Sequence, residues 1–181
     1  MKNRNVRNGL GIFLVVLVLG LLVGMTFVNH TYATANPGGN DFLVHWVGTR
    51  AFLIDGISPY SDETALRIQT LVYGRAAQAG EHELRVAYPL YSVLVFFPYA
   101  LIEDFTWARA VWMTVLEAGL ILLIYLSMRL ARWRPRPVTL GLFLLFSLMW
   151  YHAVRPLILG NVVILIALGL VAGLLAIRSR Q

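Results

Sequence analysis

The chain has 181 residues, of which 59% are hydrophobic and 13% are charged. A soluble domain contains roughly 45–50% apolar and about 25% charged residues, so this composition indicates an integral membrane protein. The sequence contains no cysteine, which excludes disulfides, thiolate catalysis and Cys-ligated metal sites. The net charge of +6 is concentrated beside apolar runs, where basic residues mainly set membrane orientation, so it does not indicate a nucleic-acid partner.

The first apolar run, Leu10–Val28, follows a basic segment at 2–7. Its length matches the roughly 20 residues that a helix needs to cross a bilayer and exceeds the about 7–15 residues of a signal-peptide core. We therefore expect a retained span (10–28), with a cytoplasmic N-terminus because of the basic flank. His30–Gly39 is predicted to be a turn, since Asn36-Pro37-Gly38-Gly39 breaks any helix.

The stretch 29–88 carries mixed charges and is predicted to be an extracytoplasmic loop of amphipathic helices. One helix is expected over Asp41–Ile54, and its Asp41 and His45 share a face because they lie four residues apart. Such a helix is suited to lying at the membrane surface. A second helix is predicted from a cap at Ser61 to about Ala79.

The second half of the chain contains three further apolar runs that are predicted to span the membrane, at 107–128, 138–154 and 162–177. The run 89–102 contains Pro98 and is short, so it is either re-entrant or a short fifth helix. If it does not cross, every strongly basic segment is cytoplasmic: Lys2, Arg4, Arg7, Arg129, Arg132, Arg134, Arg136, Arg178 and Arg180. The positive-inside rule therefore favours about four transmembrane helices in one all-α membrane domain (1–181), with both ends in the cytoplasm.

Three sites carry ionisable groups suited to chemistry. Asp41 can orient the imidazole of His45 or share a substrate proton with it, or it can simply complement the helix dipole. Glu117 lies midway along an expected span. An ionisable side chain at that depth either marks a functional site or is a protonated glutamate hydrogen-bonded to a neighbouring helix. Arg155 either binds a phosphate through bidentate hydrogen bonds or marks the membrane interface. Nucleotide-binding, serine-hydrolase and zinc-protease signatures are absent.

Short motifs follow one another along almost the whole chain. They are Asp41, Gly56-Ile57-Ser58-Pro59-Tyr60, Tyr88-Pro89-Leu90, Phe97-Pro98-Tyr99-Ala100-Leu101 and Gly160-Asn161. Their order resembles the N-terminal half of membrane glycosyltransferases of the GT-C type. Within that type the chain is most similar to glycosyltransferase family 87, the polyprenyl-phosphate-mannose-dependent mannosyltransferases. The chain departs at Asn161, because the family has a Gly-Gln pair there.

The resemblance implies an inverting sugar transfer on the outer side of the cell membrane. Asp41 would be the general base, and the acceptor hydroxyl would attack the anomeric carbon of a sugar, mannose by the resemblance, carried on a polyprenyl phosphate. No metal or cofactor is implied, because the lipid phosphate is already the leaving group. Substrate-binding positions are expected at His45, Tyr60, Tyr88, Arg155 and Asn161.

Members of this family are much longer than the present chain, and their later spans complete the donor groove. We therefore expect a protein partner or a missing C-terminal half, beside the lipid bilayer and the lipid-linked donor. A second hypothesis is a non-catalytic accessory or structural subunit of a larger membrane complex. A third hypothesis is a small transporter, which the ionisable Glu117 within an expected span suggests.

Overall fold

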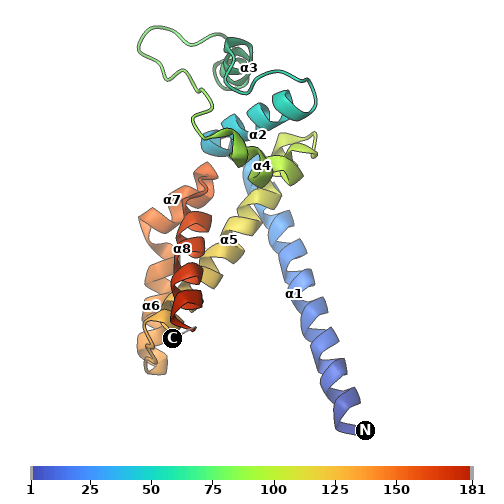
Figure 1. The fold of residues 1–181 in the computed structure, drawn as a ribbon, viewed down its shortest axis with the longest axis vertical. Coiled ribbons are helices and arrows are strands. Elements are labelled where there is room, and N and C mark those ends of the chain that lie inside the picture. Colours follow the sequence, from blue (N-terminus) through green and yellow to red (C-terminus); the bar gives the residue numbers. More distant parts are fainter. Residues whose placement is uncertain (1, 180–181) are drawn as a thin grey trace.

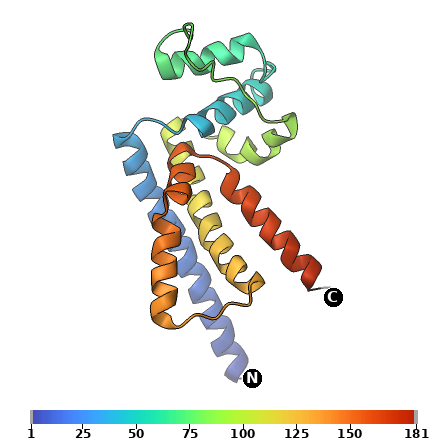
Figure 2. The same ribbon diagram turned by 90° about the vertical axis from the view of Figure 1, so that its left-hand side faces the viewer.

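The computed structural model describes residues 2–179, which form helices joined by loops, with no strand in this range. A layer of short helices sits at one end of a stem of longer ones (Figures 1 and 2). In chain order, the elements are α1 (Lys2–Ala35), α2 (Asn40–Leu53), α3 (Asp62–Tyr73), the 3-10 turn η1 (Leu90–Ser92), α4 (Val93–Ala100), α5 (Phe105–Leu130), α6 (Pro137–Met149), α7 (Tyr151–Leu159) and α8 (Val163–Arg178).

The stem contains the helices that can cross a membrane. Gly9–Ala35 of α1 and Phe105–Leu130 of α5 are long and apolar enough to do so, with 27 and 26 residues. α6 and α7 qualify together as one broken span or a re-entrant loop, since they bend by 42° where they meet. Within the described residues, the protein is thus a helical membrane protein with two or three candidate spans.

Three expectations for the stem are wrong. The expected turn at His30–Gly39 begins later, because α1 continues to Ala35 and only the Asn-Pro-Gly-Gly stretch breaks it. The expected unbroken span 138–154 is interrupted at Trp150, whose backbone is extended (φ −64°, ψ 133°). The expected short loop after it is also wrong, since α7 continues through Arg155 to Leu159.

The layer is built around α2, which was expected to lie amphipathically at the membrane surface. Instead, every residue from Phe42 to Thr49 is buried. The reason is that α3, α4, α5 and α7 all pack against this helix, so its middle has no free polar face. α3 starts as expected, with the Ser61 hydroxyl accepting the Thr64 backbone N–H at 3.2 Å, but it ends early at Gly74 (φ 72°).

α4 lies in the layer beside α2. With η1 it covers Leu90–Ala100, which at 1.5 Å per residue reaches only about half of the roughly 30 Å hydrocarbon core. Its end is tied to α2, because the Trp46 indole N–H donates to the Tyr99 carbonyl at 3.1 Å and Arg50 donates to the Ala100 carbonyl at 2.6 Å. This geometry favours a segment that does not cross.

Aromatic side chains form the core where the layer meets the stem. Phe42, Phe96 and Trp112 are almost wholly buried, and the Phe42 and Trp112 rings stack with centroids 5.5 Å apart. These rings contribute large buried areas and fix the two parts relative to each other. At the opposite end of the stem, the α5–α6 link lies beside the end of α8, whereas the start of α1 points away from both (Figure 1).

Candidate functional site

Asp41 is placed by the break between α1 and α2. Gly39 adopts a left-handed conformation (φ 79°), and α2 then begins with Asp41 in its first turn. Arg109 of α5 lies directly beneath, so close that a Cβ on Gly39 would come within 2.5 Å of its Nε. The buried Arg109 donates to the Asn36 carbonyl at 2.8 Å and to the Ile158 carbonyl at 3.1 Å, which joins the end of α1 to the end of α7.

A second close contact brings residue 160 against residue 42. Gly160 is left-handed (φ 74°), and a Cβ there would come within 2.5 Å of the Phe42 Cβ, so no larger residue fits without a shift. The Trp112 indole N–H donates to the Gly160 carbonyl at 2.8 Å. Asp41 precedes Phe42 and Asn161 follows Gly160. The contact between Gly160 and Phe42 therefore places the side chains of Asp41 and Asn161 beside each other.

The Asn161 amide holds the Asp41 carboxylate. Its Nδ2 donates to Asp41 Oδ2 at 2.9 Å, and its Oδ1 accepts the Val163 backbone N–H at 3.0 Å at the start of α8. The amide is therefore oriented from both ends. Within the described residues, Asp41 Oδ1 accepts no hydrogen bond, so one carboxylate oxygen remains available to a substrate.

The carboxylate borders an open hollow of about 460 Å³ between α2, α7 and the start of α8. Its polar lining comes from Asp41, His152, Arg155 and Asn161. Arg155 is exposed, and its guanidinium donates to the Tyr151 hydroxyl and lies over the Tyr151 ring. In the part of the chain that the structure describes, no carboxylate forms an ion pair with Arg155. The hollow thus presents a carboxylate and a free guanidinium to the same space.

His45 lies on the other side of Asp41 and is buried. Its ring stacks between Tyr88 (centroids 4.0 Å apart) and Phe96 (4.8 Å). Burial lowers the pKa of His45 to about 4, although the nearby Asp41 carboxylate opposes the shift. The imidazole is therefore neutral at pH 7. Within the described residues it makes no hydrogen bond to Asp41, so the expected orientation of the imidazole by the carboxylate is not observed.

Two tyrosines complete this side. Burial raises the pKa of the Tyr88 hydroxyl, and the Asp41 carboxylate adds to the effect. The Tyr60 hydroxyl donates to the Tyr88 carbonyl at 2.8 Å and anchors the loop that carries it. The structure thus brings His45 and Tyr88 close to Asp41, whereas Tyr60 contacts only the Tyr88 backbone; Arg155 and Asn161 lie with Asp41 in the hollow.

Glu117 belongs to a different place. Its Oε2 accepts the Asn29 amide N–H at 2.8 Å, the same amide nitrogen lies 3.1 Å from the Thr114 hydroxyl, and Thr114 in turn meets Thr26 at 3.0 Å. These polar groups join α1 to α5 inside the stem. Of the two interpretations of Glu117, the contacts match a hydrogen bond to a neighbouring helix.

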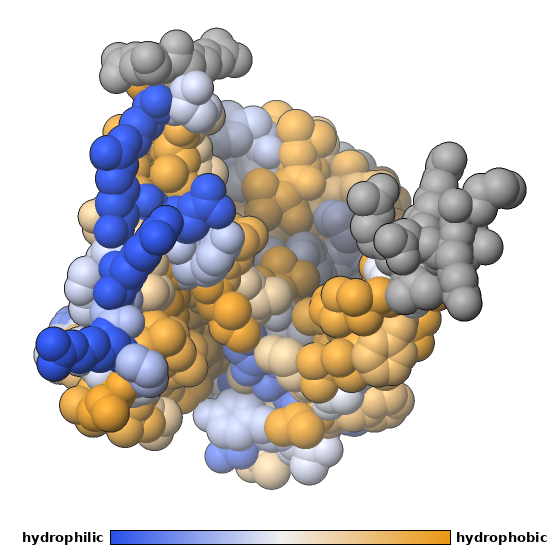
Figure 3. Space-filling model, turned by 90° about the horizontal axis from the view of Figure 1, so that it is seen from below, coloured by the Kyte–Doolittle hydropathy of each residue, from blue (hydrophilic) through white to orange (hydrophobic). Residues whose placement is uncertain are grey.

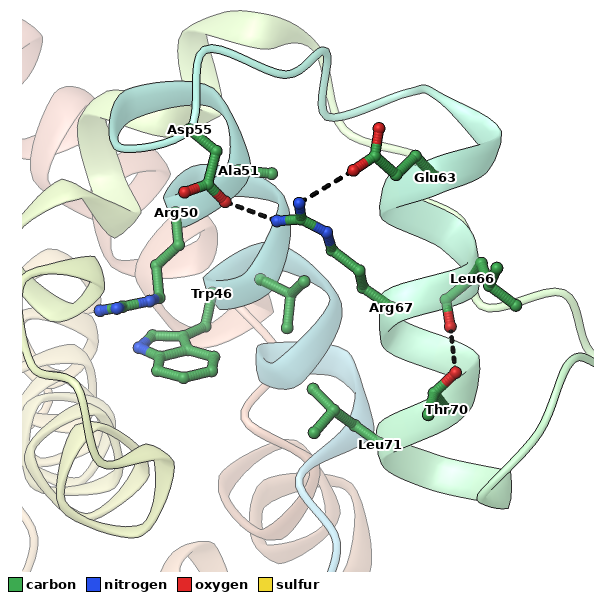
Figure 4. A pocket seen from close by; sticks show the side chains of 10 residues that line it. Trp46, Arg50, Ala51, Asp55, Glu63, Leu66, Arg67, Thr70 and Leu71 are labelled. Atoms are coloured by element: carbon green, nitrogen blue, oxygen red, sulfur yellow. Dashed lines mark hydrogen bonds and ion pairs between the residues drawn. The ribbon is translucent and has the colours of Figure 1, made fainter.

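A larger hollow of about 590 Å³ lies between α2 and α3, away from Asp41 (Figure 4). Arg67 of α3 reaches across it to Asp55 at 2.5 Å and also pairs with Glu63, one turn earlier on its own helix, at 2.9 Å. Both carboxylates of this hollow are therefore already paired. Within the described residues, no group of three or more His, Asp or Glu is arranged to hold a metal ion.

Several residues of the site were not singled out from the sequence. His152 lines the hollow, while Arg109 and Trp112 position its two halves. Arg109 carried a usable signal, because an arginine near the start of an apolar span requires a partner. His152 and Trp112 carried none, since their role depends on contacts between distant parts of the chain.

Comparisons with protein-family models, with curated proteins and with solved structures found no match for this chain.

Proposed function

We propose that the chain is a GT-C-like membrane glycosyltransferase, or part of one. It would transfer a sugar, mannose by the resemblance, from a polyprenyl-phosphate donor to an extracytoplasmic acceptor. The observation that carries the proposal is the hollow in which the Asp41 carboxylate, with one free oxygen, shares space with the unpaired Arg155. A base and a phosphate-binding cation are the two groups that such a transfer requires.

The reaction is a single displacement. Asp41 Oδ1 takes the proton of the acceptor hydroxyl as its oxygen forms a bond to the anomeric carbon from one face. The bond from that carbon to the phosphate oxygen breaks on the opposite face, its electron pair goes to the phosphate, and the configuration inverts. Arg155 stabilises the released phosphate charge through its planar guanidinium. Asp41 then loses its proton to water, and the neutral His45 packs beside it.

The same proposal includes four spans in the cell membrane, with both ends in the cytoplasm. α1 and α5 are two of them, α6 with α7 the third, and α8 the fourth, while α4 stays at the outer interface. Support comes from the basic segments at the end of the stem opposite Asp41, which carry no acidic residue among them. The hollow is open on one side, and further helices from a partner would complete the donor groove.

Sugar transfer by Asp41→Asn tests the mechanism. The purified chain is reconstituted in vesicles with labelled polyprenyl-phosphate-mannose and a lipid-extract acceptor, alone and with the membrane fraction that supplies partners. A general base contributes about 10²–10⁴-fold, so the variant should lose transfer by at least that lower factor. Asp62→Asn is the matched control, because its side chain is 91% exposed on α3 and lies outside the hollow. Unchanged transfer by Asp41→Asn would contradict the mechanism.

A non-catalytic subunit is the competing function. It is favoured by the hydrogen bond from Asn161 to Asp41, since a carboxylate that only holds two helices together would be bound in that way. Purification from native membranes separates the two functions. A stable stoichiometric assembly without transfer activity, weakened by Asp41→Asn, would support the subunit.

A further inference from the structure

A third hollow, of about 610 Å³, lies at the end of the stem opposite Asp41. It is lined by Tyr125, Met128, Arg129, Arg132, Trp133 and Arg134, from the end of α5 and the link to α6. In the view from this end, hydrophilic residues gather on one side between broad hydrophobic areas (Figure 3).

The hollow is shaped by the way in which α5 ends. Arg132 has a left-handed backbone (φ 52°), which is unusual for a residue other than glycine, and the Trp133 N–H donates back to the Met128 carbonyl at 3.0 Å. The chain therefore turns sharply, and the Trp133 ring packs edge-on against Phe143 of α6 at 4.9 Å. Arg178 of α8 donates to the Leu130 carbonyl at 2.5 Å and holds the same corner.

Among residues 2–179, no acidic side chain compensates the charge of this hollow. No acidic residue follows Glu117 in the sequence, and within the described residues none of Arg129, Arg132 and Arg134 forms an ion pair. Arg129 instead donates to the Tyr125 hydroxyl at 2.9 Å. Unpaired guanidinium groups gathered around one space match an oxyanion, and phosphate above all.

The position of the hollow identifies where the phosphate comes from. α5 is a candidate span that ends at Leu130, so the residues after it lie at the level of the lipid headgroups. Tyr125 and Trp133 are half exposed, as aromatic residues at a membrane interface are. Charges that only set orientation need neither a hollow nor aromatic walls.

We propose that this hollow binds the headgroup of an anionic phospholipid, with Arg129, Arg132 and Arg134 on its phosphate and Tyr125 and Trp133 against the upper part of its chains. Basic pockets beside membrane helices bind such headgroups. The site is independent of the transfer at Asp41, because it lies at the other end of the stem.

Native mass spectrometry of the full chain, released from detergent with phosphatidylglycerol or phosphatidylcholine, tests the proposal. Wild-type protein should retain phosphatidylglycerol in preference to phosphatidylcholine. Each juxtamembrane arginine contributes about five-fold to anionic-lipid binding, so Arg129→Gln, Arg132→Gln and Arg134→Gln together should lower retention on the order of a hundred-fold. The corresponding Lys variants should keep part of it, because they retain charge but lose the bidentate fork.

The matched control is the triple variant of Arg67→Gln, Arg75→Gln and Arg85→Gln, which removes as many arginines from the opposite end and should leave the lipid preference unchanged. Thermal midpoints of both triple variants show whether each is folded. Equal lipid retention by the wild type and the Arg129, Arg132 and Arg134 triple variant would overturn the proposal, as would equal loss in the control. Displacement of the lipid by inorganic phosphate at comparable concentration would also overturn it, since the ligand would then be free phosphate.

Discussion

The arginines at the two ends of this molecule differ in whether they form ion pairs. In the layer, Arg67, Arg75 and Arg85 each contact a carboxylate at 2.5–2.9 Å. At the far end of the stem, Arg129 donates to a hydroxyl oxygen and Arg178 to a carbonyl oxygen instead. The proposed lipid site would account for this difference, because a surface in water pairs its own charges whereas an end at the headgroups can leave them to the lipid.

The two ends also differ in what they do with large apolar side chains. Phe42 in the layer is 0% exposed, whereas Phe13 on α1 is 61% exposed. In the layer, water drives such rings into a shared core. α1 is a candidate membrane span, and in lipid burial against protein would bring no comparable gain. The same residue type therefore has a different energetic role at each end.

The largest effect should come from truncating a core ring. Phe42→Ala removes a fully buried ring that contacts Trp112, and changes of this kind cost about 3–5 kcal/mol through lost burial and the cavity left behind. Thermal unfolding in detergent, followed by tryptophan fluorescence, measures the loss. Phe13→Ala is the control and should leave the midpoint unchanged. Equal shifts in both variants would show that the two ends do not differ in this way.

The sequence was informative about the elements and less so about their surroundings. Apolar run lengths located α1 and α5, and the chemistry of Ser61 predicted the start of α3, because both depend on local residues. The burial of α2 could not be read from its pattern, since its polar His45 and Thr49 are covered by helices distant in the chain. The break at Trp150 could not be predicted either, because no glycine or proline lies at that position.

A smaller effect is expected from pH. The pKa of His45 falls from 6.5 to about 4 on folding because the ring is buried. The unfolded chain therefore binds more protons between these values, and stability that is fully present above pH 6.5 is lost as the pH falls to about 4. At 1.36 kcal/mol per pKa unit, the loss is about 3 kcal/mol.

His45→Phe keeps a flat ring between Tyr88 and Phe96 but cannot be protonated. The difference in unfolding free energy between the wild type and this variant is followed in detergent from pH 7.5 to pH 4, about 3.5 pH units that include the transition. This difference separates the effect of His45 from that of the carboxylates that also titrate. The wild type should lose stability on acidification more steeply than the variant. Parallel curves would mean that His45 is not buried in its neutral form.

The candidate site could be predicted in its chemistry but not in its assembly. Asp41, Arg155 and Asn161 were chosen for residue type and for a family resemblance, and all three line one hollow. What joins them is the packing of Gly160 on Phe42 and of Trp112 beneath, which links positions more than a hundred residues apart. Spacing along a chain contains no information about such a contact.

The smallest effect should come from the ion pair of the layer. The Arg67 and Asp55 side chains are 41% and 40% exposed, so solvent screens their attraction, and such pairs contribute about 0.2–1 kcal/mol. A double-mutant cycle with Arg67→Gln and Asp55→Asn should give a coupling in that range, which added salt reduces. Arg129→Gln, which breaks no ion pair, should change stability by less still. A coupling of several kcal/mol would mean that the pair is shielded from water, and pairing at this end would then stabilise the fold rather than neutralise a water-facing surface.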